Sequence, residues 1–146
     1  MGLSVVVGAC DDRSMTRYAI DAAVALRLIR DPLEPSAGRQ LVAPSVLRSH
    51  VLSRLYTEVR AGRLDERTAR AELEGLAELK IRLLGDRVSR STAFKLATQL
   101  DWPDVTPAEY LAVAVLQADA LVTDDPVLRD AATGRIPIAE FDDLAR

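Results

Sequence analysis

Short apolar segments alternate with longer amphipathic stretches along most of this chain. A short apolar segment that ends at a polar turn is typical of a buried strand, whereas apolar residues three and four positions apart predict a helix. These patterns predict strands at 17–20, 41–43, 80–84, 118–123 and 135–141. They predict helices at 22–30, 44–60, 64–79, 88–102, 105–117 and 124–133, with 41–43 alternatively leading into the helix that begins at Pro44.

Strands separated by helices indicate an α/β domain with a mainly parallel sheet. The length of 146 residues suits one domain with its own core. We therefore expect a single domain over residues 15–146, preceded by residues 1–14 as either an N-terminal arm or a mis-assigned start. In such a sheet, ligands bind beyond the carboxyl ends of the strands.

Composition and charge narrow the functional classes. The formal net charge of -3 gives no overall basic field that would attract nucleic acid or an acidic membrane, although it leaves room for a local basic patch. The single cysteine, Cys10, excludes an intramolecular disulfide and a paired-cysteine metal site. No apolar run approaches the ~20 residues that span a bilayer, so we expect a cytoplasmic protein without a membrane span.

Acidic residues recur where helices are predicted to start. Asp21 follows the first strand, Asp124 and Asp125 follow strand 118–123, and Glu109 lies in the segment TPAEY. Each of these acids has an ordinary structural explanation when taken alone. Asp21 and Asp125 are natural N-caps, and Glu109 would close a capping box that begins at Thr106.

Taken together, the acids suggest chemistry. The positions that follow parallel strands lie at one edge of the sheet, and Glu109 joins them if its helix starts at that edge. Carboxylates gathered in one place repel each other unless a cation compensates for them. Hard oxygen ligands at this density suit Mg²⁺ or Mn²⁺, which can activate water for attack on a phosphodiester.

Four segments, in their order along the chain, resemble the PIN-domain ribonucleases and more narrowly the VapC-type toxins of bacterial toxin–antitoxin pairs. They are YAIDAAVALRLIRD, VAPSVLRSHVLSRLY, RLLGD and TPAEYLAVAVLQADALVTDD. The resemblance runs from about residue 16 to residue 141. It implies a PIN-like α/β/α sandwich with a mainly parallel central sheet, usually a homodimer, that cleaves RNA with Mg²⁺ or Mn²⁺. It also implies an antitoxin partner whose tail lies across the acidic groove.

The resemblance assigns roles to several residues. Asp21 matches the first acid of the family, Glu109 matches the third, where Asp is commoner, and Asp125 matches the acid after the last core strand. Asp124 is an extra neighbour, and Thr123 matches the family's hydroxyl residue at this turn. The implied metal ligands are therefore Asp21, Glu109, Asp124 and Asp125.

His50, the only histidine, stands where the family typically has its second acid, Glu. Glu58 cannot replace it, because eight residues along a helix correspond to ~12 Å. Three interpretations of His50 are open. It is a ligand in a site that prefers Mn²⁺, a general base or phosphate contact beside the metal, or a locally packed residue in a weakened site.

The leading hypothesis is a divalent-metal-dependent endoribonuclease that hydrolyses RNA phosphodiesters and serves as the toxin of a toxin–antitoxin pair. The alternative is a catalytically weakened PIN domain that binds an antitoxin or RNA. A third, weaker interpretation is an unrelated α/β domain whose acids only cap helices. Few aromatic residues are present for base stacking, so RNA would be recognised by its shape and phosphates. Candidate partner surfaces are the apolar helix faces at 44–59 and 68–81, and candidate phosphate contacts are Arg17, Arg27, Arg48 and Arg54.

Overall fold

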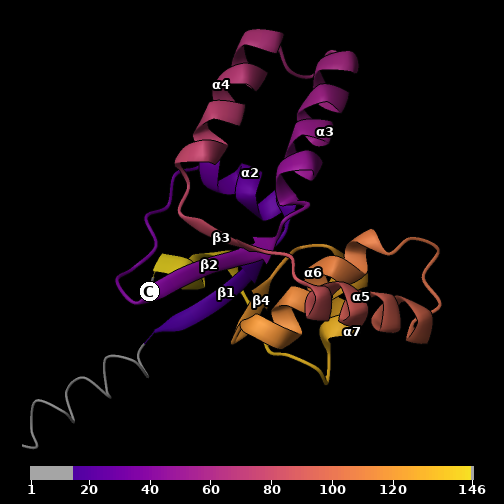
Figure 1. Cartoon of the computed structure of the whole chain (residues 1–146). Helices are drawn as coiled ribbons and strands as arrows, with labels where there is room; N and C mark the ends of the chain where they lie inside the picture. Colours follow the sequence, from indigo (N-terminus) through magenta and orange to yellow (C-terminus); the bar gives the residue numbers. More distant parts are fainter. Residues whose placement is uncertain (1–14, 146) are drawn as a thin grey trace, which may run out of the picture.

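A computed structural model describes residues 15–145 of the protein. Five parallel strands form one sheet in the order β3-β2-β1-β4-β5 (Figure 1). The strands are β1 (Thr16–Ile20), β2 (Arg39–Pro44), β3 (Ile81–Leu84), β4 (Ala120–Val122) and β5 (Ile138–Ala139). The chain proceeds outward from β1 in one direction through β2 and β3, and then crosses to the other side for β4 and β5. The strand order therefore reverses between β1 and β4, the place where ligands bind in open α/β sheets.

Helices cover both faces of this sheet. Figure 1 shows α2, α3 and α4 grouped on one side and α5, α6 and α7 on the other. The helices are α2 (Ala22–Arg30), α3 (Leu47–Arg60), α4 (Glu66–Glu78), α5 (Arg87–Gln99), α6 (Thr106–Gln117) and α7 (Pro126–Ala132), and the 3₁₀ helix η1 (Phe141–Ala145) follows. The predicted α/β/α sandwich with a parallel sheet is confirmed.

The apolar segments of the sequence form the core, as buried strands and as the buried faces of helices. Every residue of β4 is buried, as expected of a short apolar strand covered on both faces. Helix α6 buries a continuous stretch from Tyr110 to Ala114 against the sheet and α5. The most completely buried large side chains come from strands and helices of both layers, namely Ile20, Val42, Leu47, Val51, Leu111, Val113, Leu121 and Leu144.

Pro44 was expected at the start of a helix, and this placement is wrong. It is the last residue of β2 and pairs with Leu84 of β3, so 41–43 belongs to a strand. Ser45, the next residue, donates its backbone N–H to the Leu84 carbonyl, and α3 begins only at Leu47. A proline is tolerated here because the strand ends before its missing N–H would be needed.

Two further expectations concern the N-terminal residues and membrane spans. Residues 1–14, predicted to be an arm or a mis-assigned start, and Cys10 with them, lie outside the described residues. Within residues 15–145, none of the helices combines the length and apolar character that crossing a bilayer requires.

Candidate active site at the strand ends

The register between β1 and β4 brings the first predicted site residues together. Ile20 pairs with Val122, so Asp21 and Thr123 are the next residues on two adjacent parallel strands. The Thr123 hydroxyl donates a short hydrogen bond to Asp21 Oδ2 and accepts one from the backbone N–H of Asp125 at 3.1 Å. Asp21, Thr123 and Asp125 are thus linked through one hydroxyl group, although 102 residues separate the first two.

Asp21 is both a helix cap and a buried acid. Its Oδ1 accepts the Val24 N–H at 2.9 Å at the start of α2, as the sequence predicted, and the residue is only 7% exposed. Burial raises the pKa of Asp21, and the nearby Asp125 carboxylate adds to this effect. The hydrogen bonds from Thr123 and Val24 and the positive charge of Arg54 act in the opposite direction. Ionised Asp21 is therefore a group that gains from a nearby cation.

The two acids that follow β4 are more open to solvent. Asp125 caps α7, its Oδ1 accepting the Val127 N–H at 2.9 Å, which confirms the predicted N-cap. Asp124 is exposed and lies 3.8 Å from an Arg27 guanidinium nitrogen. Each carboxylate keeps an oxygen that no hydrogen bond within the described residues occupies, because the cap uses only one oxygen of Asp125.

A cavity of about 450 Å³ opens over these acids. Four aspartates line it, and one of them, Asp104, was not predicted from the sequence. Asp104 lies just before α6 and accepts hydrogen bonds from the Thr106 N–H and hydroxyl at 3.3 and 3.2 Å. The signal that could have found it is local, since an Asp two residues before Thr-Pro is a typical turn acceptor at a helix start. The side chains of the cavity that matter here are Asp21, His50, Arg54, Asp104, Tyr110, Asp124 and Asp125.

Glu109 does not join this cavity. Its side chain lines a separate cavity of about 120 Å³ together with Gly85, Ser89 and Arg90. The predicted capping box with Thr106 is also wrong, because α6 has its N-cap at Val105 and no side-chain cap bond. Consecutive helical residues point ~100° apart, and in α6 it is Tyr110, not Glu109, that lines the cavity with Asp21. The assignment of Glu109 as a metal ligand therefore finds no support in the geometry.

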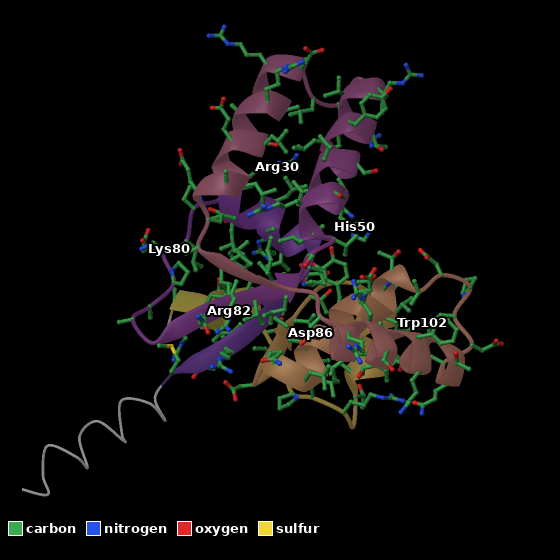
Figure 2. All side chains as sticks on the ribbon, viewed as in Figure 1. Arg30, His50, Lys80, Arg82, Asp86 and Trp102 are labelled. Atoms are coloured by element: carbon green, nitrogen blue, oxygen red, sulfur yellow. The ribbon has the colours of Figure 1, made fainter. Side chains whose placement is uncertain are left out.

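His50 lines the cavity, as its match to the family's second acid implied. It lies on α3 near the start of α6 (Figure 2), with its Nδ1 2.8 Å from the Tyr110 hydroxyl. The two rings stack with centroids 5.4 Å apart and an 18° angle between their planes. The pKa of Tyr110 is raised by burial and by the charges of Asp21 and Glu109, so its phenol stays protonated and can donate to Nδ1. The Tyr110 hydroxyl is therefore the hydrogen-bond partner of one of the two ring nitrogens of His50.

The carboxylates fit a hydrated cation better than an enclosed one. Within residues 15–145, no three Asp, Glu, His or Cys side chains are close enough together to surround a metal ion. Mg²⁺, however, is usually held by one or two carboxylates and completes its shell with water or substrate phosphate. Asp21 and Asp125, joined through Thr123, offer that arrangement, with Asp104 and Asp124 adding negative charge around the cavity.

Some of the charged residues considered in the sequence lie near the site, and others do not. Glu58, which is too far along α3 to replace His50, accepts a hydrogen bond from Arg30 at 2.9 Å. Arg27 and Arg54 do lie near the acids. Arg17 does not, since its backbone N–H binds Asp119 and its side chain lines a cavity with Arg82 and Met15 at the amino end of the sheet.

Comparisons with known proteins support the fold. No protein-family model and no curated protein sequence matches this chain. Among solved structures, PAE2754 from Pyrobaculum aerophilum is similar, with a TM-score of 0.68, 20% identity and coverage of 90% of this chain and 93% of that one. VapBC2 from Rickettsia felis, solved with a DNA fragment from its promoter, is similar with a TM-score of 0.60, 9% identity and coverage of 85% and 98%.

These comparisons define the class at the level of the fold. The chain has a PIN-like α/β/α fold of the kind found in VapBC2, which confirms the structural part of the resemblance seen in the sequence. Identities of 20% and 9% show the fold alone, so activity has to be argued from the cavity and its side chains.

Proposed function

We propose that this protein is a divalent-metal-dependent endoribonuclease of the VapC type. The observation that carries the proposal is the linked set Asp21–Thr123–Asp125 at the point where the strand order reverses, facing a cavity lined by two further aspartates. Negative charge gathered at this edge of the sheet is most simply explained by a cation and a phosphate that bind there.

Each residue has a defined role in this proposal. Asp21 and Asp125 would hold Mg²⁺ or Mn²⁺, and Thr123 keeps both residues in position through its hydroxyl. A cation bound there would supply an activated water for attack on the phosphate and would offset the charge that develops on it. Arg54, which lines the same cavity, is placed to contact a phosphate oxygen, and His50 faces the cavity from α3.

The first test is calorimetric titration with Mn²⁺ and Mg²⁺ of the wild type and Asp21→Ala, together with cleavage of a mixed RNA pool. We expect wild-type binding that the substitution abolishes, and cleavage that needs the metal and falls by a factor on the order of 10² or more in the variant. Circular dichroism serves as the check that Asp21→Ala is folded. Absence of metal binding by the wild type contradicts the proposal.

The alternative is a weakened domain that binds RNA or an antitoxin without efficient cleavage. The hydrogen bond between His50 and Tyr110 favours it, since it engages the residue that stands in place of the family's second acid. His50→Glu separates the two. A sharp gain in metal-dependent cleavage means that the natural site is weakened, whereas a loss means that histidine has a task in catalysis.

The partners are proposed by analogy. The similar VapBC2 structure is of a protein pair bound to promoter DNA, and this supports an antitoxin as partner. An apolar groove between α3 and α4, lined by Leu52, Leu55, Tyr56 and Leu73, is a candidate surface for the antitoxin or for a second copy in a homodimer. Co-expression with the product of a neighbouring gene and light scattering of the purified chain test these two expectations.

A further inference from the structure

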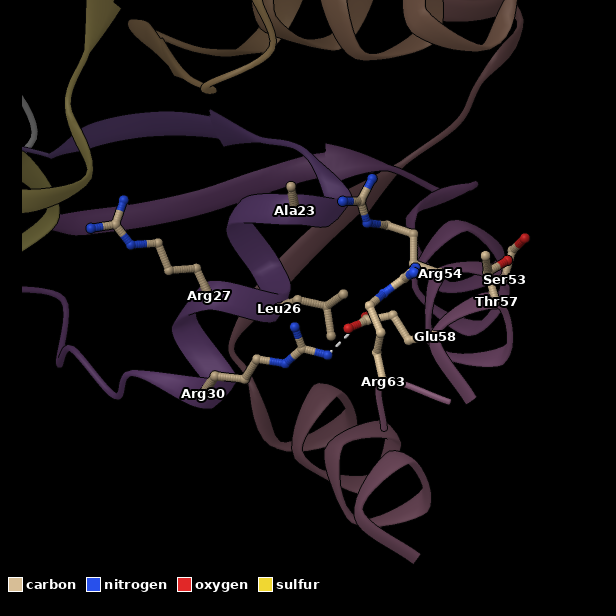
Figure 3. Close-up of a pocket in the computed structure, with 9 residues that line it drawn as sticks. All are labelled: Ala23, Leu26, Arg27, Arg30, Ser53, Arg54, Thr57, Glu58 and Arg63. Carbon is tan, nitrogen blue, oxygen red and sulfur yellow. Dashed lines mark hydrogen bonds and ion pairs between the residues drawn. The ribbon is translucent and has the colours of Figure 1, made fainter. Parts of the chain in front are cut away.

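A second cavity, of about 650 Å³, lies beside the carboxylate cavity and has the opposite charge. We call it the arginine cavity, because Arg27, Arg30, Arg54 and Arg63 line it (Figure 3). It lies between α2 and α3, and Ser53 and Thr57 of α3 also line it. We propose that the arginine cavity binds backbone phosphates of the RNA strand next to the phosphate that is cleaved. This inference rests on the proposed nuclease function and names how that site holds its substrate.

The two cavities adjoin. Ala23 and Arg54 line both of them, so a strand that lies in the arginine cavity is next to the carboxylates. A site made of aspartates repels a polyanion, and the net charge of -3 provides no general attraction. Binding of RNA therefore requires a local positive surface, and this one adjoins the acids.

The four arginines are not equivalent. Arg30 is held in place by Glu58 and Glu72, whose oxygens lie 2.9 Å from its Nη2. These bonds tie α2 to α3 and α4, and they neutralise the Arg30 charge, so Arg30 forms part of the wall. Arg27 lies over the Phe141 ring, 3.9 Å from its centroid, and approaches Asp124.

Arg54 and Arg63 are the two arginines of this cavity whose charge no ion pair among the described residues neutralises. Within residues 15–145, neither guanidinium makes a hydrogen bond or ion pair with another side chain. Both reach the same cavity, Arg54 from α3 and Arg63 from the turn after it (Figure 3). Arginine presents several N–H groups that match phosphate oxygens. No aromatic ring lines this cavity in the described part of the chain, which points to recognition of the backbone rather than of bases.

The experiment measures fluorescence anisotropy of a labelled single-stranded oligoribonucleotide in EDTA over a range of salt concentrations. The proteins are the wild type, Arg54→Gln, Arg63→Gln, the double variant and Arg87→Gln. Arg87 is an exposed arginine in the first turn of α5, outside this cavity, and its substitution changes the net charge equally. Thermal melting serves as the check that all five proteins are folded.

We expect each cavity substitution to weaken binding about 5-fold at ~0.1 M salt and to reduce the slope of log K against log salt by roughly 0.7, the value for one phosphate contact on a single strand. Arg87→Gln should change neither quantity appreciably. Equal effects of Arg63→Gln and Arg87→Gln would overturn the inference, because they would reveal a net-charge effect. The inference is also overturned if a polyglutamate peptide, and not RNA, shows the dependence on Arg54 and Arg63.

Two further measurements separate this inference from the proposed function. Asp21→Asn should lose metal-dependent cleavage and keep its RNA affinity in EDTA. If cleavage depends on Asp21 while the arginine variants bind RNA like the wild type, the nuclease stands and the arginine cavity is rejected. If the wild type cleaves no RNA with either metal, the proposed function fails by that result, whatever the anisotropy shows.

Discussion

The two sides of the carboxylate cavity are built in different ways. Asp21, Thr123 and Asp125 follow adjacent strands, and hydrogen bonds join all three. The opposite side comes from helices, with His50 on α3 and Tyr110 on α6 joined by one hydrogen bond. The strand side is fixed by backbone pairing, whereas the helix side depends on how each helix is rotated about its axis. The strand side is therefore the part that should hold a metal, and the helix side is the part that can vary.

The largest effect should come from breaking the link on the strand side. Thr123→Val keeps the shape of a side chain that is 1% exposed but removes the donor to Asp21 and the acceptor for the Asp125 N–H. We expect metal affinity to fall 10- to 100-fold, as for other partners that orient a ligand. Calorimetry with Mn²⁺ measures this, and Thr123→Ser serves as the control that retains the hydroxyl. Similar affinities in the two variants would show that the link does not orient Asp21.

A smaller effect should distinguish the two acids near the start of α6. Asp104 lines the carboxylate cavity and Glu109 does not. Asp104→Asn should weaken Mn²⁺ binding about 5-fold, corresponding to ~1 kcal/mol of attraction between an exposed carboxylate and a nearby cation. Glu109→Gln, with the same change in charge, should leave the affinity within about 2-fold. A larger loss in Glu109→Gln would restore the sequence-based assignment.

The hydrogen bond on the helix side should affect stability modestly. Tyr110→Phe removes the hydroxyl that meets His50 Nδ1, and we expect a loss of about 1 kcal/mol in the free energy of unfolding. Urea unfolding measures this loss. A double-mutant cycle with His50→Ala provides the control, since Tyr110→Phe should cost less once its partner is absent. An unchanged cost in the His50→Ala background means that the hydroxyl acts through another group.

The smallest expected effect is a pH dependence that originates in Asp21. Because burial raises the pKa of Asp21, this group favours the native state most below the pKa of an unfolded aspartate. That contribution is lost as the pH rises through the raised pKa. In EDTA, Asp21→Asn should therefore gain stability relative to the wild type as the pH rises above about 4, the pKa of an unfolded aspartate. Urea unfolding at several pH values measures this difference, and a constant difference contradicts the expectation.

The contrast between the two sides also explains what could be predicted from the sequence. Apolar strands that end in Asp21 and in Thr123-Asp124-Asp125 define both the sheet and the acids at its edge, because parallel strands place their carboxyl ends together. Helical positions are harder to predict, since a shift of one residue turns a side chain by ~100°. In α6 it is Tyr110, one position after Glu109, that lines the site, and Asp104 was missed because it follows no strand, unlike Asp21 and Asp125.

The arginine cavity was beyond prediction for a different reason. Arg27, Arg54 and Arg63 come from α2, α3 and the turn that follows, and their convergence depends on how α2 packs against α3. The sequence showed an arginine-rich chain with a slightly negative net charge, and Arg27 and Arg54 were among several candidates. Nothing in it indicated that Glu58 and Glu72 would neutralise Arg30 and leave Arg54 and Arg63 unpaired.

The hydrogen bond between Asp21 and Thr123 has a consequence for how the protein folds during its synthesis. The two residues are separated by 102 positions, and the strand that carries Thr123 inserts beside β1 only after β2 and β3 have been made. Contacts this distant in sequence form late in folding, because the entropy of closing the intervening chain has to be overcome first. A growing polypeptide therefore has no assembled carboxylate site until synthesis has passed Asp125. The cleavage of RNA proposed for this site therefore cannot begin while these residues are still being synthesised.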